Sequence, residues 1–412
     1  MKTIKKRLNY LISWSLLLAI TIQLVGLHTT KVLAAEMELE SPAAILMEAS
    51  TGKILYEKNA DEERMLASVT KIMTILLIFE ALESGAINLE DKVSVSEHAA
   101  SMGGSQVFLE AGETQTVKDM LKCIIISSAN DASVAMSEYI AGSEEEFVAR
   151  MNEKCKALGM EHTHFLNCCG LDDDILEGHY SSAKDIAIMS RELITRFPQV
   201  SEYSTVWMDT ITHVTRKGET EFGLTNTNKL IRTYDGITGL KTGSTSKAKF
   251  CLSATASRNG MDLIAVIMAA PSPTVRFKEA AKLLDYGFAN CSLYKDEHED
   301  FVNQYIPVTK GKEEQVELVA EQPFSYICFT GESKEKITKR IELPEEVEAP
   351  IREGDKIGKI VYSMSTGDSN TESENSNNQT EIGTVSILAK HSVEKASYLD
   401  CLKKVANEFF VG

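Results

Sequence analysis

Positive charge is in short supply in this chain. Its 412 residues include 43 lysines and arginines against 60 acidic residues, which gives a formal net charge of −17. A chain this acidic is repelled by phosphate backbones, so we expect no nucleic-acid partner. A small substrate, or one that is neutral to basic, fits this charge better.

Metal-ligand and disulfide patterns are also missing. The 8 cysteines are scattered and form no CxxC pair, so we expect neither a structural zinc site nor the framework of a small disulfide-stapled domain. Cys123 and Cys251 stand in apolar or strand-like runs, where small buried hydrophobic residues are the simpler interpretation. His162 and His164 have no third ligand at a suitable spacing. The sequence therefore predicts no metal and no cofactor.

Long apolar segments are scarce as well. With 43% hydrophobic and 25% charged residues the composition is that of a globular protein of one to three domains, which excludes a disordered tail and an integral membrane bundle. An apolar run at residues 11–25 follows a cationic start and precedes small residues at 32–34, a pattern typical of a secretory signal peptide spanning residues 1–34. The alternative is a retained membrane anchor, although the run is short for a spanning helix. We therefore predict an exported protein.

The middle of the chain predicts one α/β (α+β) domain at residues 35–290. Two strands are indicated at 43–49 and 53–57, a buried helix at 66–83, mainly helices from 116 to 196, and a hairpin of 248–257 with 261–270 around Asn259-Gly260. Sheet segments at both ends with helices between them favour terminal strands that share one antiparallel sheet.

The rest of the chain predicts a small all-β domain at residues 296–390. Its strand signals fall at 315–320, 325–329, 356–362 and 382–388, and a polar insertion at 365–380 has a composition that does not favour order. Residues 392–412 show the spacing of an amphipathic helix. That helix could lie on a membrane surface or pack on the β-domain. Its balanced charges offer no special attraction to anionic lipid.

A serine and a lysine stand three residues apart at the start of the predicted helix 66–83. This spacing places the Ser68 hydroxyl and the Lys71 ammonium on one face of the helix, one turn apart. A serine becomes a nucleophile only beside a base, and a lysine is a base only when its pKa is lowered by burial or nearby positive charge. The pair alone is a weak signal, because exposed serine–lysine pairs occur by chance.

Two further motifs strengthen the signal. Ser128 and Asn130 fall on a predicted connection between helices, where a hydroxyl can relay a proton and an amide can hold a peptide; the alternative is a helix N-cap. Lys241-Thr242-Gly243 falls on a predicted strand, where the glycine would let a ligand approach the backbone; the alternative is an ordinary strand end.

In this order the three motifs resemble those of class A β-lactamases and penicillin-binding proteins. Over nearly its whole length the chain resembles the serine D-alanyl-D-alanine carboxypeptidases, which are low-molecular-mass penicillin-binding proteins. The segments that carry this resemblance are residues 66–71, 127–133, 163–165, 170–172, 180–183 and 239–243. The resemblance implies a peptidoglycan stem peptide ending in D-Ala-D-Ala as substrate and β-lactam antibiotics as covalent inhibitors. It also implies a place outside the cytoplasmic membrane, with the C-terminal helix as an anchor.

The resemblance also implies roles for individual residues. Ser68 would attack the carbonyl of the terminal peptide bond with Lys71 as its base, Ser128 would pass the proton to the leaving D-alanine, and Asn130 would hold the peptide. Water would then hydrolyse the acyl-enzyme.

A further group of residues would bind the substrate around the reacting carbonyl. Lys241 and Thr242, followed by Gly243, would meet the terminal carboxylate, and the backbone N–H groups of Ser68 and Ser244 would form the oxyanion hole. Some relatives have histidine in place of Ser244, so no deacylation role passes to that side chain. Arg276 is a weaker candidate for carboxylate recognition; the alternative is a surface arginine in the first turn of a helix.

Three other functions compete with this interpretation. A class A β-lactamase needs the glutamate of a Glu-x-x-Leu-Asn motif, but Thr163 stands four residues before Asn167, so we expect slow release of a penicilloyl adduct. An endopeptidase that cleaves peptide cross-links would share the same motifs. A non-catalytic penicillin-sensing or wall-binding module would not need the complete proton-transfer set.

Overall fold

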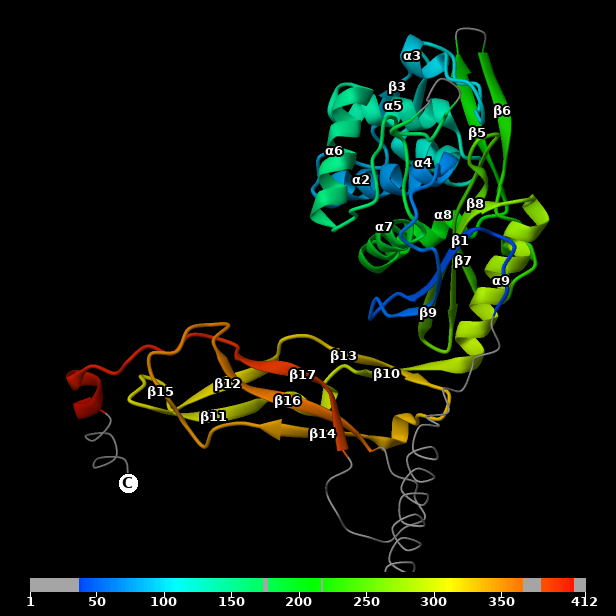
Figure 1. Ribbon diagram of the computed structural model, residues 1–412. Helices are drawn as coiled ribbons and strands as arrows, with labels where there is room; N and C mark the ends of the chain where they lie inside the picture. The colour runs from blue at the N-terminus through cyan, green and yellow to red at the C-terminus, as the bar shows by residue number, and fades with distance from the viewer. Residues whose placement is uncertain (1–36, 173–176, 216–217, 366–378, 404–412) are drawn as a thin grey trace, which may run out of the picture. The chain divides into compact units, whose positions relative to one another are not determined.

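The computed structural model describes residues 37–172, 177–215, 218–365 and 379–403 (Figure 1). An α+β region comes first along the chain, and an all-β region follows it, as the sequence predicts. The predicted signal peptide at residues 1–34 lies outside the described residues. Among the helices that the structure describes, none has the length and apolarity needed to cross a membrane.

A five-stranded antiparallel sheet forms the centre of the α+β region, in the order β2-β1-β9-β8-β7. Its strands are β1 (Ala43–Glu48), β2 (Ile54–Lys58), β7 (Ile237–Thr245), β8 (Lys249–Arg258) and β9 (Met261–Ala270). The first strand pairs with the last one, so segments from both ends of the region share one sheet. Asn259 and Gly260 join β8 to β9 with positive φ angles of 52° and 75°, as a two-residue hairpin turn requires. Strand β7 contains Lys241-Thr242-Gly243 and is therefore called the motif strand below. It lies at the edge of the sheet.

Helix α2 (Lys71–Glu83) is the most deeply buried helix beside this sheet. Of its 13 residues 10 are buried, so it is enclosed by protein on nearly all sides. A short 3₁₀ turn, η1 (Ala67–Thr70), leads into it. Around it lie α4 (Val117–Ile125), α5 (Asn130–Ala141), α6 (Glu144–Ala157) and α7 (Ala183–Arg196).

Helix α9 (Pro273–Asn290) covers the other face of the sheet (Figure 1). Successive residues of a strand point to opposite faces. Ile264 of β9 therefore belongs to the core shared with α2 and α7, whereas Leu263 lies against Gly287 of α9. The region is completed by short elements and one hairpin that the sequence did not indicate: β3 (Lys92–Ser94), α3 (Glu97–Ala100), β4 (Thr114–Thr116), α8 (Ser201–Ser204), β5 (Met208–Thr215) and β6 (Gly218–Thr225).

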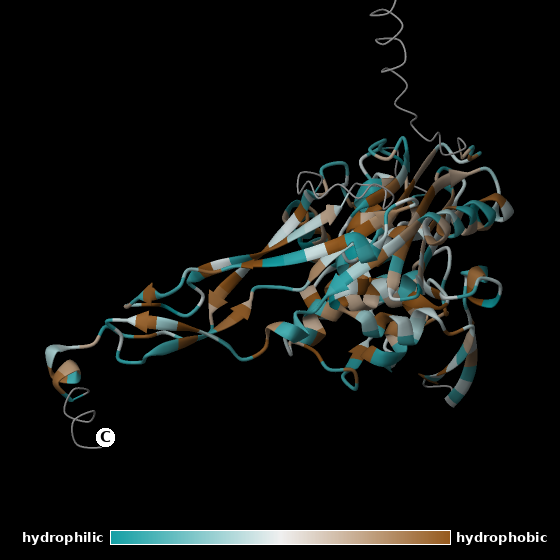
Figure 2. Ribbon diagram, turned by 90° about the horizontal axis from the view of Figure 1, so that it is seen from below, coloured by the Kyte–Doolittle hydropathy of each residue, from teal (hydrophilic) through white to brown (hydrophobic). Residues whose placement is uncertain are grey.

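The all-β region contains a two-stranded sheet, β10-β13, and a six-stranded sheet in the order β14-β16-β17-β12-β11-β15. The bounds are β10 (Cys291–Asp296), β11 (Gln304–Thr309), β12 (Gln315–Ala320), β13 (Phe324–Phe329), β14 (Ile337–Glu342), β15 (Val347–Glu348), β16 (Lys356–Ser365) and β17 (Gln379–Ala389). Hydrophobic and hydrophilic residues are interspersed along these strands (Figure 2), because every second side chain enters the core. In that core the rings of Tyr362 and Phe324 stack with their centroids 3.8 Å apart.

Three details of this region differ from the sequence prediction. The β-structure starts with β10 at Cys291, directly after α9. The prediction placed this start later, because no glycine or proline stands between the helix and the strand to mark the boundary. The ends of the predicted polar insertion are paired strand, with Ser365 opposite Gln379, while residues 366–378 lie outside the described part. Residues 392–397 are not helical, and Val393 is buried and bonds to the backbone of Ile351.

Part of the predicted C-terminal helix is described. Residues 398–403 are helical, and Tyr398, Leu399 and Leu402 are 80%, 68% and 50% exposed. Packing of these apolar side chains on the β-region, one of the two alternatives, is therefore not what this structure shows. Residues 404–412 lie outside the described residues.

Candidate active site

Ser68 lies in the turn η1, on a backbone that unusual contacts hold in place. The preceding residue, Ala67, has a φ of 48°, in the left-handed region that residues other than glycine rarely adopt. The Thr70 hydroxyl donates to the Ala67 carbonyl at 2.8 Å and receives a bond of 2.9 Å from Nε2 of His179. This direction follows because the Leu166 N–H donates to Nδ1 of His179, which leaves the ring proton on Nε2.

A second contact fixes the same turn. A Cβ at Gly170 would lie 1.9 Å from the Ala67 oxygen, so only glycine lets this segment approach the turn so closely. Burial lowers the pKa of His179 to about 4, which keeps its ring neutral at physiological pH. The turn that carries Ser68 is thus held in place by two contacts: the hydrogen bonds of Thr70 and the close approach of Gly170.

Lys71 is fully buried, and its ammonium group has three partners. Its Nζ lies 3.1 Å from Ser68 Oγ, 2.5 Å from Asn130 Oδ1 and 2.7 Å from the carbonyl oxygen of Cys169. Burial lowers the pKa of Lys71 against the weaker opposing effect of nearby acidic groups, so the neutral amine becomes accessible. The structure therefore brings Ser68 and Lys71 together in the arrangement that a serine and its base require.

Ser128 and Lys241 form a second serine–lysine pair in the site. The Lys241 Nζ donates to Ser128 Oγ at 2.7 Å and to the Thr242 carbonyl at 2.9 Å. Burial lowers the pKa of Lys241 well below its usual value, and the charges of Lys71 and Arg276 lower it further. The N-cap alternative for Ser128 is wrong, because the residue at that position is Ala129, which makes no side-chain cap bond.

Gly243 brings strand β7 against the nucleophile turn. A Cβ there would lie 2.6 Å from the Leu66 oxygen, 2.9 Å from the Val69 nitrogen and 3.1 Å from the Ser68 nitrogen. On the side where a Cβ would point, the group that approaches this glycine is the protein's own backbone. The approach of a ligand to Gly243 stays a prediction. Ser244, the next residue, is exposed at the sheet edge.

Arg276 lies behind the motif strand. It is only 7% exposed, and its Nη1 donates to the carbonyls of Gly243 at 3.0 Å and Cys251 at 3.2 Å. Burial lowers its pKa to about 10. The alternative of a surface arginine is therefore wrong, and this side chain braces β7 and β8 from the α9 side. Cys251 is itself buried and free, as is Cys123.

Two features of the site could not be predicted from the three motifs. Asp131 accepts the N–H groups of Val107 and Leu109, both at 3.1 Å, and so holds the loop whose Gly103 carbonyl accepts from Asn130 Nδ2 at 2.7 Å. The second feature is the Cys169 carbonyl that faces Lys71. Every residue has a carbonyl group, so no residue type marks the one that enters the site.

Comparison with known proteins agrees with this geometry. Residues 29–272 match the sequence model of the D-alanyl-D-alanine carboxypeptidase family, and residues 291–395 match that of the penicillin-binding protein 5 C-terminal domain. The chain belongs to the D-alanyl-D-alanine carboxypeptidase family. The resemblance, the fold class and the activity class predicted from the sequence are thereby confirmed.

Relatives of this carboxypeptidase match over most of their length. D-alanyl-D-alanine carboxypeptidase DacF of Bacillus subtilis is 42% identical over 375 residues, which cover 91% of either chain. Among solved structures, penicillin-binding protein 5 from Haemophilus influenzae has a TM-score of 0.70 at 29% identity, covering 87% of this chain and 98% of its own. A PBP3 from Streptococcus pneumoniae, described as a peptidoglycan synthesis regulatory factor, has a TM-score of 0.66 at 30% identity, with coverage of 87% and 100%.

Proposed function

We propose that this carboxypeptidase removes the terminal D-alanine from peptidoglycan stem peptides through an acyl-enzyme on Ser68. The observation that carries the proposal is the position of the buried Lys71 amine. In its neutral form it can donate its two hydrogens to the oxygens of Asn130 and Cys169, which leaves its lone pair for the Ser68 hydroxyl at 3.1 Å. Lys71 then takes the proton as Ser68 Oγ bonds to the carbonyl carbon.

The leaving D-alanine must also receive a proton. Ser128 passes the proton on in this proposal: its hydroxyl gives a proton to the leaving nitrogen and takes up the one that Lys71 received from Ser68, while Lys241 Nζ, 2.7 Å from Ser128 Oγ, holds the hydroxyl in place. The substrate carboxylate binds Lys241 and Thr242. A carboxylate there raises the pKa of Lys241, so substrate binding restores a charge that burial disfavours. Asn130 and Gly243 complete the peptide-binding edge, and Arg276 supports it from behind.

The tetrahedral intermediate carries a negative charge on the former carbonyl oxygen. The backbone N–H groups of Ser68, in the turn η1, and Ser244, on β7, are our candidates for the oxyanion hole, since N–H groups that point at a developing negative charge stabilise it. Water then hydrolyses the acyl-enzyme. With Thr163 in place of the β-lactamase glutamate, we expect penicillin to form a covalent adduct that is released slowly.

The proposal extends to the organisation and location of the chain. A signal peptide at residues 1–34 would direct export, the peptidase domain would span residues 35–290, and the accessory β-domain would start at Cys291, where β10 begins, and extend to residue 390. The C-terminal segment 392–412 would attach the enzyme to the outer face of the membrane. The exposed apolar side chains of Tyr398 and Leu399 support a surface role for this segment.

Release of D-alanine tests the proposal. A short peptide ending in Lys-D-Ala-D-Ala is incubated with the wild-type chain and with Ser68→Ala, and the D-alanine released is measured. Release that requires Ser68 is the expected result. No release, together with stable labelling of Ser68 by penicillin, would contradict the carboxypeptidase proposal and favour cleavage of cross-links or penicillin sensing.

A further inference from the structure

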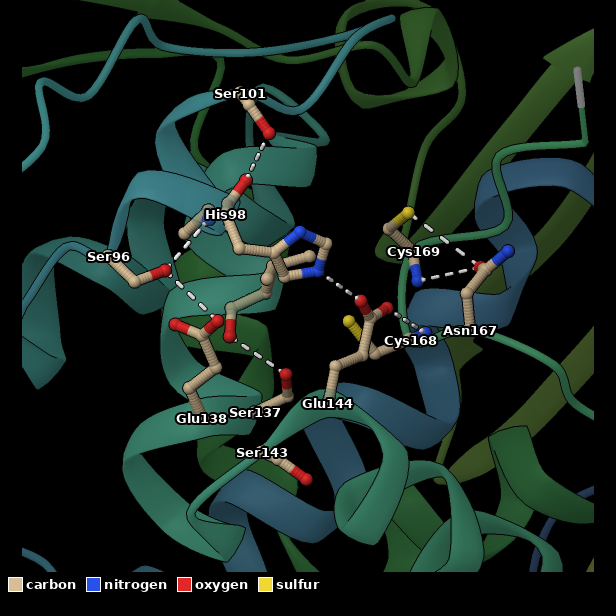
Figure 3. A network of polar contacts seen from close by, with 12 residues as sticks. Ser96, His98, Ser101, Ser137, Glu138, Ser143, Glu144, Asn167, Cys168 and Cys169 are labelled. Carbon is tan, nitrogen blue, oxygen red and sulfur yellow. Dashed lines mark hydrogen bonds and ion pairs between the residues drawn. The ribbon is translucent and has the colours of Figure 1, made fainter.

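Asn167 organises the backbone turn that faces Lys71. Its Oδ1 accepts the N–H group of Cys169 at 3.2 Å (Figure 3). The same oxygen accepts the Gly170 N–H at 2.6 Å, and Nδ2 donates to the Leu171 carbonyl at 2.8 Å. One side chain therefore bonds to three consecutive residues of the turn. Few other arrangements of residues 169–171 would satisfy all three bonds together.

The turn held in this way directs two carbonyl groups at helix α2. The Cys168 oxygen accepts the hydroxyl of Thr74 at 2.5 Å, and the Cys169 oxygen accepts Lys71 Nζ at 2.7 Å. Glu144 holds the start of the turn, because its Oε1 accepts the Cys168 N–H at 3.1 Å (Figure 3). The Cys169 carbonyl is thus a fixed acceptor on the amine and not a chance contact.

The geometry points to Asn167 as a positioning residue for the reaction: through the Cys169 carbonyl it sets the direction in which the Lys71 lone pair meets Ser68. This inference rests on the proposed role of Lys71 as the base. A primary amine has two hydrogens and one lone pair, so two fixed acceptors determine where the lone pair points. Asn130 supplies one of these acceptors, and the turn held by Asn167 supplies the other.

Loss of the Asn167 side chain should change both the rate and its pH dependence. A free Cys169 carbonyl can rotate away from the amine, and the lone pair then spends less time in line with Ser68, which lowers the maximal rate of acylation. A carbonyl acceptor also favours the charged amine, so its loss lowers the pKa of Lys71. The rise of the rate with pH would move to lower pH. Four other titratable groups on the surrounding elements act on Lys71 or are acted on by it: Asp131, Lys241, Cys168 and Cys169. The substitution changes none of them.

Asn152 of α6 offers a matched control. It is partly buried like Asn167 and makes an equivalent pair of bonds to one backbone residue of the same segment: Oδ1 accepts the Phe165 N–H at 2.9 Å, and Nδ2 donates to the Phe165 carbonyl at 2.9 Å. None of its bonds reaches residues 168–171. A purely structural contribution should therefore be similar in the two asparagines.

The experiment measures the second-order rate of acylation by penicillin from pH 5 to 10, with the full chain as wild type, Asn167→Ala, Asn167→Asp and Asn152→Ala. Thermal unfolding is recorded for each protein. We expect Asn167→Ala to lower the maximal rate roughly tenfold to a hundredfold. We also expect it to shift the rising limb of the pH–rate profile, the range in which the rate increases with pH, to lower pH. Asn167→Asp keeps the acceptors for both N–H groups. It should recover much of the rate, while its negative charge shifts the limb to higher pH. Asn152→Ala should lose stability without a shift of the limb.

The outcomes separate this inference from the proposed function. If Asn167→Ala matches Asn152→Ala in both the maximal rate and the limb, the positioning role is wrong and the role of Lys71 stands. If the wild-type rate shows no rising limb, the role of Lys71 fails and the inference fails with it. Should Asn167→Ala not fold, the inference is decided by Asn167→Asp, and a limb that stays in place or moves to lower pH overturns it.

Discussion

Substitution of Gly243 by alanine tests whether contact between β7 and the nucleophile turn sets the activity. The added methyl group would lie 2.6 Å from the Leu66 oxygen and 2.9 Å from the Val69 nitrogen, whereas ordinary contacts begin near 3.4 Å. These neighbours are backbone atoms, so no flexible side chain can move aside. The strand and the turn must separate by several tenths of an ångström. Overpacking of this kind costs about 1–3 kcal/mol of stability.

The same separation acts on the reaction. It moves Lys241 and the edge of β7 away from Ser68, and misplacement of reacting groups by about 1 Å can lower a rate roughly a hundredfold. We therefore expect Gly243→Ala to acylate with penicillin tenfold to a hundredfold more slowly, by order of magnitude, than the wild type.

The assay is the rate of penicillin labelling, with unfolding in denaturant measured in parallel. Gly223→Ala in β6 is the matched control, because a Cβ there meets no atom within 4 Å and its φ is not positive. Gly243→Ala with wild-type labelling would refute the reasoning, and so would an equal loss in Gly223→Ala.

Three further predictions concern buried groups. Arg276→Met removes a donor from two carbonyls of the sheet, so we expect a loss of about 1–3 kcal/mol in denaturant unfolding and a higher KM for the peptide; unchanged stability would contradict the buried role. Acylation should rise with pH, because Lys71 must be neutral to act and burial places its pKa below the usual 10.5; a flat profile from pH 5 to 10 would exclude it as the base. Tyr362→Phe removes a bond of 2.8 Å to Asp296, which should lower the stability of the β-region by about 1–3 kcal/mol in thermal unfolding without altering acylation; a changed acylation rate would show that the β-region acts on the site.

Patterns among residues close together in the sequence predicted many elements of the fold. The spacing of apolar residues predicted α2, and Asn259-Gly260 predicted the β8–β9 hairpin, because both patterns are read from neighbours along the chain. The β5–β6 hairpin escaped prediction. Its exposed strands carry polar residues on both faces, so the alternation that marks a half-buried strand is weak there.

A boundary between two elements was also missed where no glycine or proline marks it. Helix α9 passes directly into β10 at Cys291 with no glycine or proline between them, and the β-region was therefore predicted to begin five residues late, near Asp296.

The chemistry-bearing side chains were easier to predict than the groups that position them. Ser68, Lys71, Ser128 and Lys241 are recognised because few residue types can act as nucleophile, base or proton relay, so residue type and spacing carry the information. The Cys169 carbonyl carries none, since any residue at that position would supply the same oxygen. What the sequence does hold is indirect: a glycine at 170 that no larger residue could replace, and an asparagine at 167. Positioning groups of this kind become visible only when the fold brings α2 and the 167–171 turn together, and for that reason the variants that test them, such as Asn167→Ala, lie outside the three motifs.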